Sequence, residues 1–456
     1  MDNLDVVVAG GGNAALCAAI SAREKGASVT VFEAAPKQMR GGNTRHTRNL
    51  RASHTTPIES LEGCYDEEEF FDDIFKVTHG NTNESLARLM IHQSMSLVSW
   101  LRSRGVHYQP ALSGTLSLNR TNAFFLGGGK TLLNKLYAHA EKIGVQIIYD
   151  AEVVSAAISN NRVHTIEVDY QEDRQTFEIG HLIAASGGFQ SNEDWMREVW
   201  GDKADRFLIR GTPYNKGKLL RTLMDAGAQT IGDPTQCHAV AIDARAPKYD
   251  GGIVSRLDSV SFGIVVNQDG RRFYDEGEDF WPKRYAIWGR LVAQQPGQIA
   301  YSIVDNKVKD RFMPSVFPPI VAPSLQDMAN QLEIDPGALT QTIDQFNQAV
   351  QPGEYDSTIL DGSHTQGLKP NKTNWALTLD ESPFLAYPLS PGITFTYLGV
   401  KINERAQVLN NSDTPFENLT AAGEIMAGNI LGEGYCAGTG MTIGGVFGRI
   451  AGENAL

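Results

Sequence analysis

Residues 4–33 contain the pattern that most limits how this chain can fold. An apolar stretch is followed by Gly10, Gly12 and Ala15, then by a helical stretch to Gly26 and a second apolar stretch that ends on Glu33. The first glycine makes a tight turn, the second lets the backbone approach a pyrophosphate, and the third small residue lets the helix pack on the strand. A helix N-terminus favours the pyrophosphate charge, and an acid about 20 residues further on accepts hydrogen bonds from the ribose. The pattern predicts a dinucleotide-binding unit.

Composition and charge exclude several classes of protein. The 456 residues suffice for two domains with full cores. The net charge of -13 argues against a nucleic-acid partner, and no stretch reaches the ~18 apolar residues of a membrane-spanning helix. Because Cys17, Cys64, Cys237 and Cys436 form no CxxC pair, we expect no metal site, no disulfide and a cytoplasmic location. An apolar stretch begins almost at residue 1, so we also expect no signal peptide.

The order of patterns predicts a discontinuous first domain with a second domain inserted into it. Alternating strand and helix patterns fill residues 1–240, whereas residues 241–375 contain proline-rich stretches, a helix near 336–350 and a polar segment. Residues 376–456 return to the first pattern and contain glycine-rich signatures at 421–424 and 448–452, with a glycine-rich stretch between them. In one class of fold both chain ends close on one flavin cofactor, so this arrangement points to a flavoenzyme.

Two further glycine-rich turns occur in the first domain. The run at 128–131 imitates a phosphate-binding loop, but Phe124 stands where such a loop requires its earlier glycine. We interpret the run as the N-terminus of a helix close to the flavin. A predicted strand at 182–185 leads into a second close backbone approach at 186–189.

These motifs together resemble the fumarate reductase and succinate dehydrogenase flavoprotein family over nearly the whole chain. The similar motifs follow the family order and lie at 41–44, 127–129, 186–189 and 448–452. Within the family, three stretches are most similar to the branch that oxidises tricarballylate: 41–49, 273–285 and 424–429. The resemblance implies an α/β fold, in which a discontinuous Rossmann-like FAD-binding domain with a GxGxxA motif carries an inserted, mobile α+β capping domain. It also implies that tricarballylate, held between the domains, is oxidised to cis-aconitate.

The resemblance assigns FAD as the cofactor. Asn43 stands where succinate dehydrogenases have the histidine that bonds FAD covalently, so we expect FAD to be held without a covalent bond. The residues expected to contact FAD are Gly10, Gly12, Asn13, Ala14, Ala15, Glu33, Ala34, Gly41, Gly42, Asn43, Thr44, Gly128, Gly129, Val153, Ser186, Gly187, Gly188, Gly423, Glu424, Gly440, Met441, Thr442 and Ile443.

The implied reaction needs cations and a base. One carbon of the saturated acid loses a proton, and its neighbour passes a hydride to flavin N5. Cations must hold the adjacent carboxylate to stabilise the enolate-like charge, and a positioned base adds about 10²–10⁴-fold. In the family an arginine shortly after a Gly-Arg-Phe-Asn-Glu-like run carries the proton. Residues 270–276 match that run, and Arg284 follows it. Lys283 and Tyr285 are the other candidates for the proton carrier. The alternative role for Arg284 is a surface salt bridge to Glu276 or Asp279.

Other positions suggest substrate-binding residues. His238 falls where the family places a carboxylate-binding histidine, although a purely structural histidine is the alternative. Arg256 replaces a Thr-Glu pair whose acid relays protons in the reductases; an arginine cannot relay them in that way, but it can fork onto a carboxylate. Tyr397 and Tyr435 lie where the reductases have other ligands, and they are either site residues or packing aromatics.

A basic loop follows the glycines at 41–42. It contains Arg45, His46, Arg48 and Arg51, which form either a solvated surface or a pocket that steers anions.

The sequence therefore predicts an FAD-dependent dehydrogenase of a small dicarboxylate or tricarboxylate, most similar to enzymes acting on tricarballylate. A desaturase or reductase of another activated carbonyl compound, such as a ketosteroid, stays open, as does a non-catalytic flavin electron-transfer module. The resemblance also implies that a separate membrane iron–sulfur protein reoxidises FAD. We therefore expect this chain to be cytoplasmic, or to be attached peripherally to the membrane through that partner.

Overall fold

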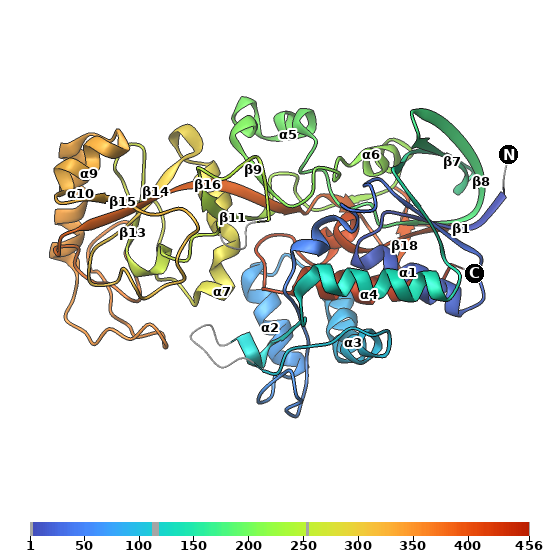
Figure 1. The fold of residues 1–456 in the computed structure, drawn as a ribbon, viewed down its shortest axis with the longest axis horizontal. Helices are drawn as coiled ribbons and strands as arrows, with labels where there is room; N and C mark the ends of the chain where they lie inside the picture. Colours follow the sequence, from blue (N-terminus) through green and yellow to red (C-terminus); the bar gives the residue numbers. More distant parts are fainter. Residues whose placement is uncertain (1–2, 112–117, 252–254, 456) are drawn as a thin grey trace.

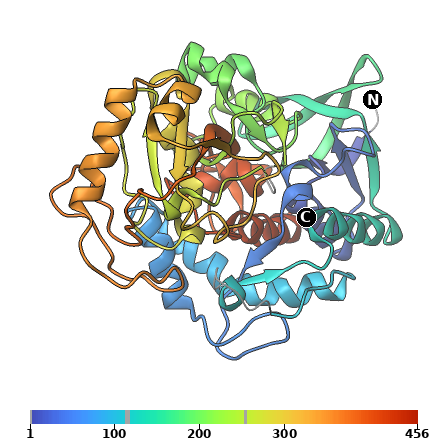
Figure 2. The ribbon, with the colours of Figure 1, turned by 60° about the vertical axis from the view of Figure 1, so that its left-hand side comes forward.

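The computed structural model describes residues 3–111, 118–251 and 255–455. Figure 1 shows two bodies side by side, one with both chain termini and the other with helices α9 (Leu325–Leu332) and α10 (Pro336–Ala349). The view in Figure 2, turned by 60°, shows the same separation.

The first body is built on a mainly parallel sheet. Its strand order is β18-β19-β8-β1-β2-β5, in which β19, β8, β1, β2 and β5 run parallel. A hairpin of β6 and β7 continues from β8. The strands are β1 (Asn3–Ala9), β2 (Val29–Glu33), β5 (Gln146–Tyr149), β6 (Ala151–Ser159), β7 (Arg162–Tyr170), β8 (Asp173–Ala184), β18 (Gln407–Leu409) and β19 (Pro415–Ala421). The apolar run 6–9 of β1 is buried, and every residue of β2 is buried, as suits strands covered on both faces.

Helices and short pieces surround this sheet. The helices are α1 (Asn13–Glu24), α2 (Glu67–Val77), α3 (Glu84–Ser103), α4 (Gly128–Lys142), α5 (Glu193–Trp200), α6 (Lys218–Asp225) and α11 (Thr439–Glu453). The 3-10 turns are η1 (Gly42–His46), η2 (Leu118–Arg120), η3 (Asp202–Arg206) and η7 (Gly423–Asn429). Two small sheets pair β3 (Asn49–Arg51) with β4 (Asn122–Phe124) and β10 (Thr230–Ile231) with β17 (Gly399–Val400).

The second body is built on a mixed sheet of order β12-β9-β16-β14-β13, with β11 and β15 also paired to β16. Its strands are β9 (Leu208–Arg210), β11 (Cys237–Asp243), β12 (Tyr249–Asp250), β13 (Ile264–Asn267), β14 (Ala300–Val304), β15 (Ile320–Ala322) and β16 (Phe384–Thr396). Its other elements are α7 (Trp281–Arg284), α8 (Trp288–Ala293), η4 (Val260–Phe262), η5 (Tyr285–Ile287), η6 (Pro296–Gln298), α9 and α10. A separate apolar core, which includes Ile303, Met328 and Phe346, lies between this sheet and α9 and α10.

The predicted fold class is confirmed: a Rossmann-like parallel sheet carries an inserted α+β unit. The helix expected near 336–350 is α10, and the helix expected after residue 128 is α4. Strand β9 lies before residue 241, β11 crosses it, and β16 lies entirely beyond residue 376, so the second sheet includes strands from outside the expected limits. The domain limits at 240 and 375 stay a prediction.

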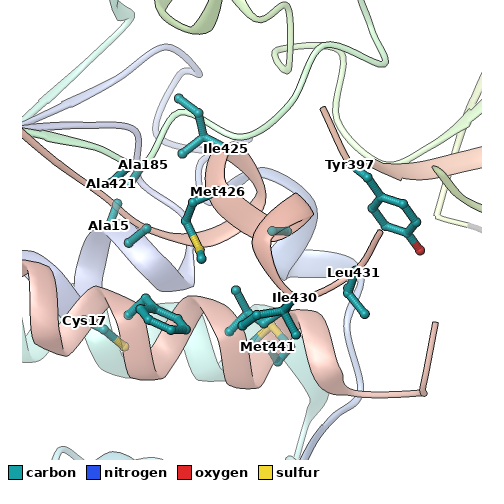
Figure 3. Packing of buried hydrophobic residues seen from close by; sticks show 14 of the residues in the cluster. Ala15, Cys17, Ala185, Tyr397, Ala421, Ile425, Met426, Ile430, Leu431 and Met441 are labelled. Carbon is teal, nitrogen blue, oxygen red and sulfur yellow. The ribbon is translucent and has the colours of Figure 1, made fainter. Parts of the chain in front are cut away.

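The two ends of the chain meet where α1 packs on α11. A Cβ added at Gly448 would lie 2.5 Å from the Ala14 carbonyl oxygen, and one added at Gly452 would lie 2.2 Å from the Ala18 oxygen. These two glycines therefore let the helix backbones approach closely. Figure 3 shows part of the apolar layer beside this pair, which includes Ala15, Cys17, Met426 and Ile430.

We expect Gly452→Val to destabilise the protein by roughly 1–3 kcal/mol, because the added side chain overpacks the α1–α11 contact. Thermal unfolding measures the effect, and Glu453→Val, one residue further along the helix at an exposed position, is the matched control. Equal melting temperatures for the two variants would contradict this account of the contact.

Candidate functional site

A cavity with about 1750 Å³ of empty space, part of it open to solvent, lies where segments of both sheets meet. Its walls come from the β1–α1 turn, the end of β2, η1, residues 185–187, residues 210–219 and the start of α11. The dinucleotide signature and residues of the second sheet therefore face one shared space.

One part of the cavity has the features of a pyrophosphate cradle. Gly10 has a φ of +112°, and a Cβ there would lie 2.4 Å from the Ala185 oxygen, so only glycine fits this turn. Helix α1 begins after Gly12 without a capping side chain, whereas Asp66 and Asn83 cap α2 and α3. The Asn13 amide donates to the Thr44 hydroxyl at 3.0 Å, and the next amides of the first turn are thus available to an anion.

Glu33 lies at the end of β2 on the cavity wall. Its carboxylate accepts hydrogen bonds from the Ala35 amide at 2.9 Å, the Gly41 amide at 3.2 Å and the Tyr137 hydroxyl at 3.4 Å. Burial raises the pKa of this carboxyl above its ordinary value. A Cβ at Gly11 would lie 2.1 Å from its Oε2 atom, so the turn and the acid are packed together.

Most of the residues predicted to contact FAD line this cavity. They are Gly10, Gly12, Asn13, Ala14, Glu33, Ala34, Gly42, Asn43, Thr44, Val153, Ser186, Gly187, Gly423, Glu424, Gly440 and Met441. The structure does not bring the remaining predicted residues to the wall: Ala15, Gly41, Gly128, Gly129, Gly188, Thr442 and Ile443.

Several of the residues off the wall support residues on it. The Gly129 amide donates to the Thr47 oxygen at 2.8 Å, and a Cβ there would lie 1.9 Å from the Thr44 oxygen. A Cβ at Gly188 would lie 2.3 Å from Glu424 Oε1. These glycines are required by close packing beneath the cavity, whereas the motif pattern alone suggests direct contact.

Asn43 joins the two bodies. Its Nδ2 donates to the Thr394 oxygen at 2.5 Å, and its Oδ1 accepts from the Thr212 amide at 2.8 Å. Thr394 belongs to β16 and Thr212 follows β9, so the η1 loop is fastened to the second sheet through one side chain. The absence of a covalent FAD bond stays a prediction.

Glu424 is a buried acid on the cavity wall. It accepts from the Thr396 amide at 2.9 Å, the Thr396 hydroxyl at 3.2 Å and Asn215 Nδ2 at 3.2 Å. Burial raises its pKa from the ordinary 4.5 to about 7.

Another part of the cavity is strongly basic. Among the described residues, three arginines line the wall: Arg48, Arg210 and Arg256. Arg256 forks onto Asp258 with two contacts of 2.7 Å, and Arg210 donates to the Thr394 hydroxyl at 3.1 Å. Burial lowers the pKa of Arg210 to about 10, with further lowering by Arg256 and Arg48. A chain of net charge -13 therefore concentrates cations at this point.

His238 lies on the same wall with its ring held between aromatic groups. It stacks on Tyr435 with centroids 4.0 Å apart and meets Tyr285 edge-on at 5.7 Å. Its Nε2 has no hydrogen-bond partner among the described residues. Burial, followed by the charges of Arg210 and Arg256, holds its pKa well below 6.5, so the imidazole is neutral and can hydrogen-bond a ligand.

Two of the predicted catalytic residues do not line the cavity. Arg284 forms an ion pair with Glu278, not with Glu276 or Asp279, and Tyr397 is fully buried with its hydroxyl donating to the Gly434 oxygen. His238, Arg256 and Tyr435 do line it, as does Tyr285, one of the rivals of Arg284. The side chain of Lys283, the other rival, lies outside the described part of the structure.

The basic residues between positions 45 and 51, which extend from η1 into β3, have separate roles. His46 and Arg48 line the cavity, and burial lowers the pKa of His46 to about 4. Arg45 donates to the Gln38 oxygen, away from the cavity. Arg51 is buried against Asp73 and donates to the Tyr65 hydroxyl, so it serves the interior of the first body.

Arg210, Trp281 and Asn215 are wall residues that sequence reasoning missed. The signal for Arg210 was a cation at the end of an apolar strand, directly before Gly211. That pattern alone does not say which cavity the strand end faces.

Among the described residues, no group of three or more His, Cys, Asp or Glu side chains could hold a metal ion. No helix within the described ranges is both long and apolar enough to cross a membrane.

The chain belongs to the FAD binding domain family, whose match spans residues 5–442. The predicted family resemblance is confirmed, and FAD is the cofactor that family membership assigns. One relative is the NADH:fumarate oxidoreductase of Klebsiella pneumoniae (strain 342), 27% identical over 99% of this chain and 47% of that protein. The chain thus spans about half of that relative. Another relative is the fumarate reductase (cytochrome) of Shewanella frigidimarina, 26% identical over 100% of this chain and 77% of that protein.

Solved structures show the same fold. The open conformation of a flavocytochrome c3 fumarate reductase superposes with a TM-score of 0.75 at 23% identity, covering 100% of this chain and 78% of that one. The 3-ketosteroid-delta4-(5alpha)-dehydrogenase of Rhodococcus jostii RHA1 also gives a TM-score of 0.75, at 20% identity, covering 100% and 97%.

Glu424 predicts a pH dependence of stability. Its folded pKa is about 7 and its ordinary value 4.5, so its contribution is fully present below pH 4.5 and is lost as the pH rises through 7. Relative to Glu424→Gln, the FAD-free wild-type protein should lose up to roughly 3 kcal/mol of stability across this window. Unfolding at a series of pH values measures this difference. The exposed Glu417→Gln is the control, and a difference that does not change with pH would refute the assignment.

Proposed function

We propose that this protein is an FAD-dependent dehydrogenase that oxidises a small polycarboxylate, tricarballylate, to cis-aconitate. The observation that carries the proposal is the cavity wall, where three arginines and neutral His238 share one space with the dinucleotide signature. Two similar proteins are named for fumarate and acrylate, which are unsaturated acids with the same kind of bond that this reaction forms.

FAD, when bound, supplies the hydride acceptor for this chemistry. Arg256, Arg210 and Arg48 would hold the substrate carboxylates and stabilise the charge that develops when the neighbouring carbon loses its proton. His238 would donate a hydrogen bond to a carboxylate through its unpartnered Nε2. Trp281 and Tyr285, which also line the wall, would exclude water from the reacting carbons.

We propose that Arg284 accepts the proton that the substrate carbon loses. It ends α7, which begins at Trp281, and it directly precedes Tyr285; both of these aromatic residues line the cavity. A guanidinium ordinarily keeps its proton, so a base must accept one from Arg284. Glu278 pairs with Arg284, so its carboxylate would take this proton, and the Tyr274 hydroxyl, which donates to Glu278 at 2.7 Å, would hold the carboxylate in place. The assignment requires the 278–285 segment to turn Arg284 towards the cavity when substrate binds.

A second candidate function is the desaturation of a ketosteroid. The fold similarity to a ketosteroid dehydrogenase and the tyrosines Tyr285 and Tyr435 on the cavity wall favour it. The three arginines on the same wall favour the polycarboxylate. They also argue against a non-catalytic electron-transfer module, which has no need of an anion site beside its cofactor.

We further propose that a separate iron–sulfur protein at the membrane reoxidises FAD, and that this chain works in the cytoplasm or on the membrane surface through that partner. The four cysteines are far apart in sequence, which supports a separate carrier of the clusters.

The substrate proposal predicts rapid anaerobic bleaching of the flavin band near ~450 nm by tricarballylate. Stopped-flow mixing with tricarballylate, succinate and a ketosteroid in parallel decides between the two candidate functions. Bleaching by the ketosteroid alone would contradict the polycarboxylate function and support ketosteroid desaturation. Bleaching by none of the three compounds would contradict both candidate functions and favour a non-catalytic electron-transfer module.

The proton assignment predicts that Arg284→Ala slows flavin reduction by tricarballylate about 10²–10⁴-fold. Arg271→Ala, an exposed arginine of the same body, is the control and should reduce normally. A near-normal rate of flavin reduction for Arg284→Ala would contradict the role of Arg284 as proton acceptor, but it would not contradict the proposed substrate.

A further inference from the structure

Arg48 differs from the other cavity arginines in its origin. It lies on the loop between η1 and β3, in the first body. Arg210 ends β9 and Arg256 bridges to Ile242 of β11, so both belong to the second sheet. The cavity therefore receives cations from both bodies, and Arg48 is the arginine that the first body supplies among the described wall residues.

The backbone around Arg48 is fixed by hydrogen bonds from two other segments. The Phe125 amide donates to the Arg48 oxygen at 2.9 Å, and the Gly129 amide donates to the Thr47 oxygen at 2.8 Å. The Thr47 amide donates in turn to the Thr44 oxygen at 3.1 Å. The side chain thus starts from a rigid platform, as a specific binding group requires.

The Arg48 guanidinium has no hydrogen bond or ion pair with any described residue, whereas Arg256 forks onto Asp258 and Arg51 pairs with Asp73. Burial and the nearby charge of Arg256 lower its pKa, while the charge of Asp258 opposes them, and the Asp258 carboxylate is already bound by Arg256. A partly buried charge is costly unless it is paired. An anion in the cavity would complete the site.

We propose that Arg48 binds a third carboxylate of the substrate and thereby makes the protein select tricarboxylates over dicarboxylates. This inference rests on the function proposed above. Arg210, Arg256 and His238 bind two carboxylates from the second body, and Arg48 binds the third from the first body. A dicarboxylate leaves Arg48 without its anion, whereas a tricarboxylate bridges the two bodies.

The test compares tricarballylate with two analogues that each lack one carboxylate, glutarate and 2-methylsuccinate. Dissociation constants come from the concentration dependence of flavin reduction for tricarballylate and from competition for the analogues. The FAD-loaded proteins are the wild type, Arg48→Met, Arg48→Lys and the control Arg45→Met, whose side chain lies on the adjoining η1 turn but off the cavity wall.

The wild type should bind tricarballylate about 10- to 100-fold more tightly than either analogue, as expected for one charged contact. Arg48→Met should lose this preference, with the analogue affinities unchanged and the limiting rate of reduction altered less than the dissociation constant. Arg48→Lys should keep part of the preference because it keeps the charge. Arg45→Met should behave like the wild type.

The inference is overturned if Arg48→Met weakens the binding of all three acids by the same factor, or if the variant keeps the wild-type preference for tricarballylate. In either case the polycarboxylate function stands, because the wild type still responds to tricarballylate. If the wild type responds to none of the acids, the proposed function fails and this inference fails with it. Flavin content and melting temperature verify folding, and Arg48→Gln replaces Arg48→Met in the same comparison if that variant does not retain FAD.

Discussion

The position of helix α1 governs the rest of this structure. Its N-cap residue, Gly12, has no capping side chain, and three contacts fix the place of the helix: the Gly10 turn against Ala185, and the approaches of Gly448 and Gly452 to its backbone. An anion cradle functions only if the helix end cannot shift, because the amide groups must converge on one point. Since α11 closes on α1, residues near the two ends of the chain together build one wall of the cavity.

The cavity has two parts that differ in the groups available to bind an anion. The cradle depends on backbone dipoles and on Glu33, while the basic part concentrates three guanidiniums within an acidic chain. Crowding such cations in a poorly hydrated space is unfavourable, which is why burial lowers the pKa values of Arg48 and Arg210. Neutral His238 adds a hydrogen-bonding group without adding another charge.

The second body contributes to the site through strands that also connect it to the first. Asn43 ties η1 to β16 and to the segment after β9, and Arg210 reaches Thr394 of the same strand. The side chains that hold the bodies together are therefore neighbours of those that line the basic wall. A substrate that contacts both bodies would be sensitive to their relative position.

The sequence by itself determined the local parts of this protein. The turn at Gly10, the acid at Glu33, the helix after residue 128 and the family membership all follow from short patterns, because backbone geometry and close packing act over a few residues. Only the tertiary structure decided which side chains share the cavity. The tertiary structure placed Arg210 on the cavity wall, whereas Arg284 lies off the wall beside Glu278. It also placed Arg48 on the wall and Arg51 in the interior beside Asp73, although these two arginines lie three positions apart in one predicted loop. Such outcomes depend on strand pairing between segments far apart in the sequence, and no local pattern encodes that pairing.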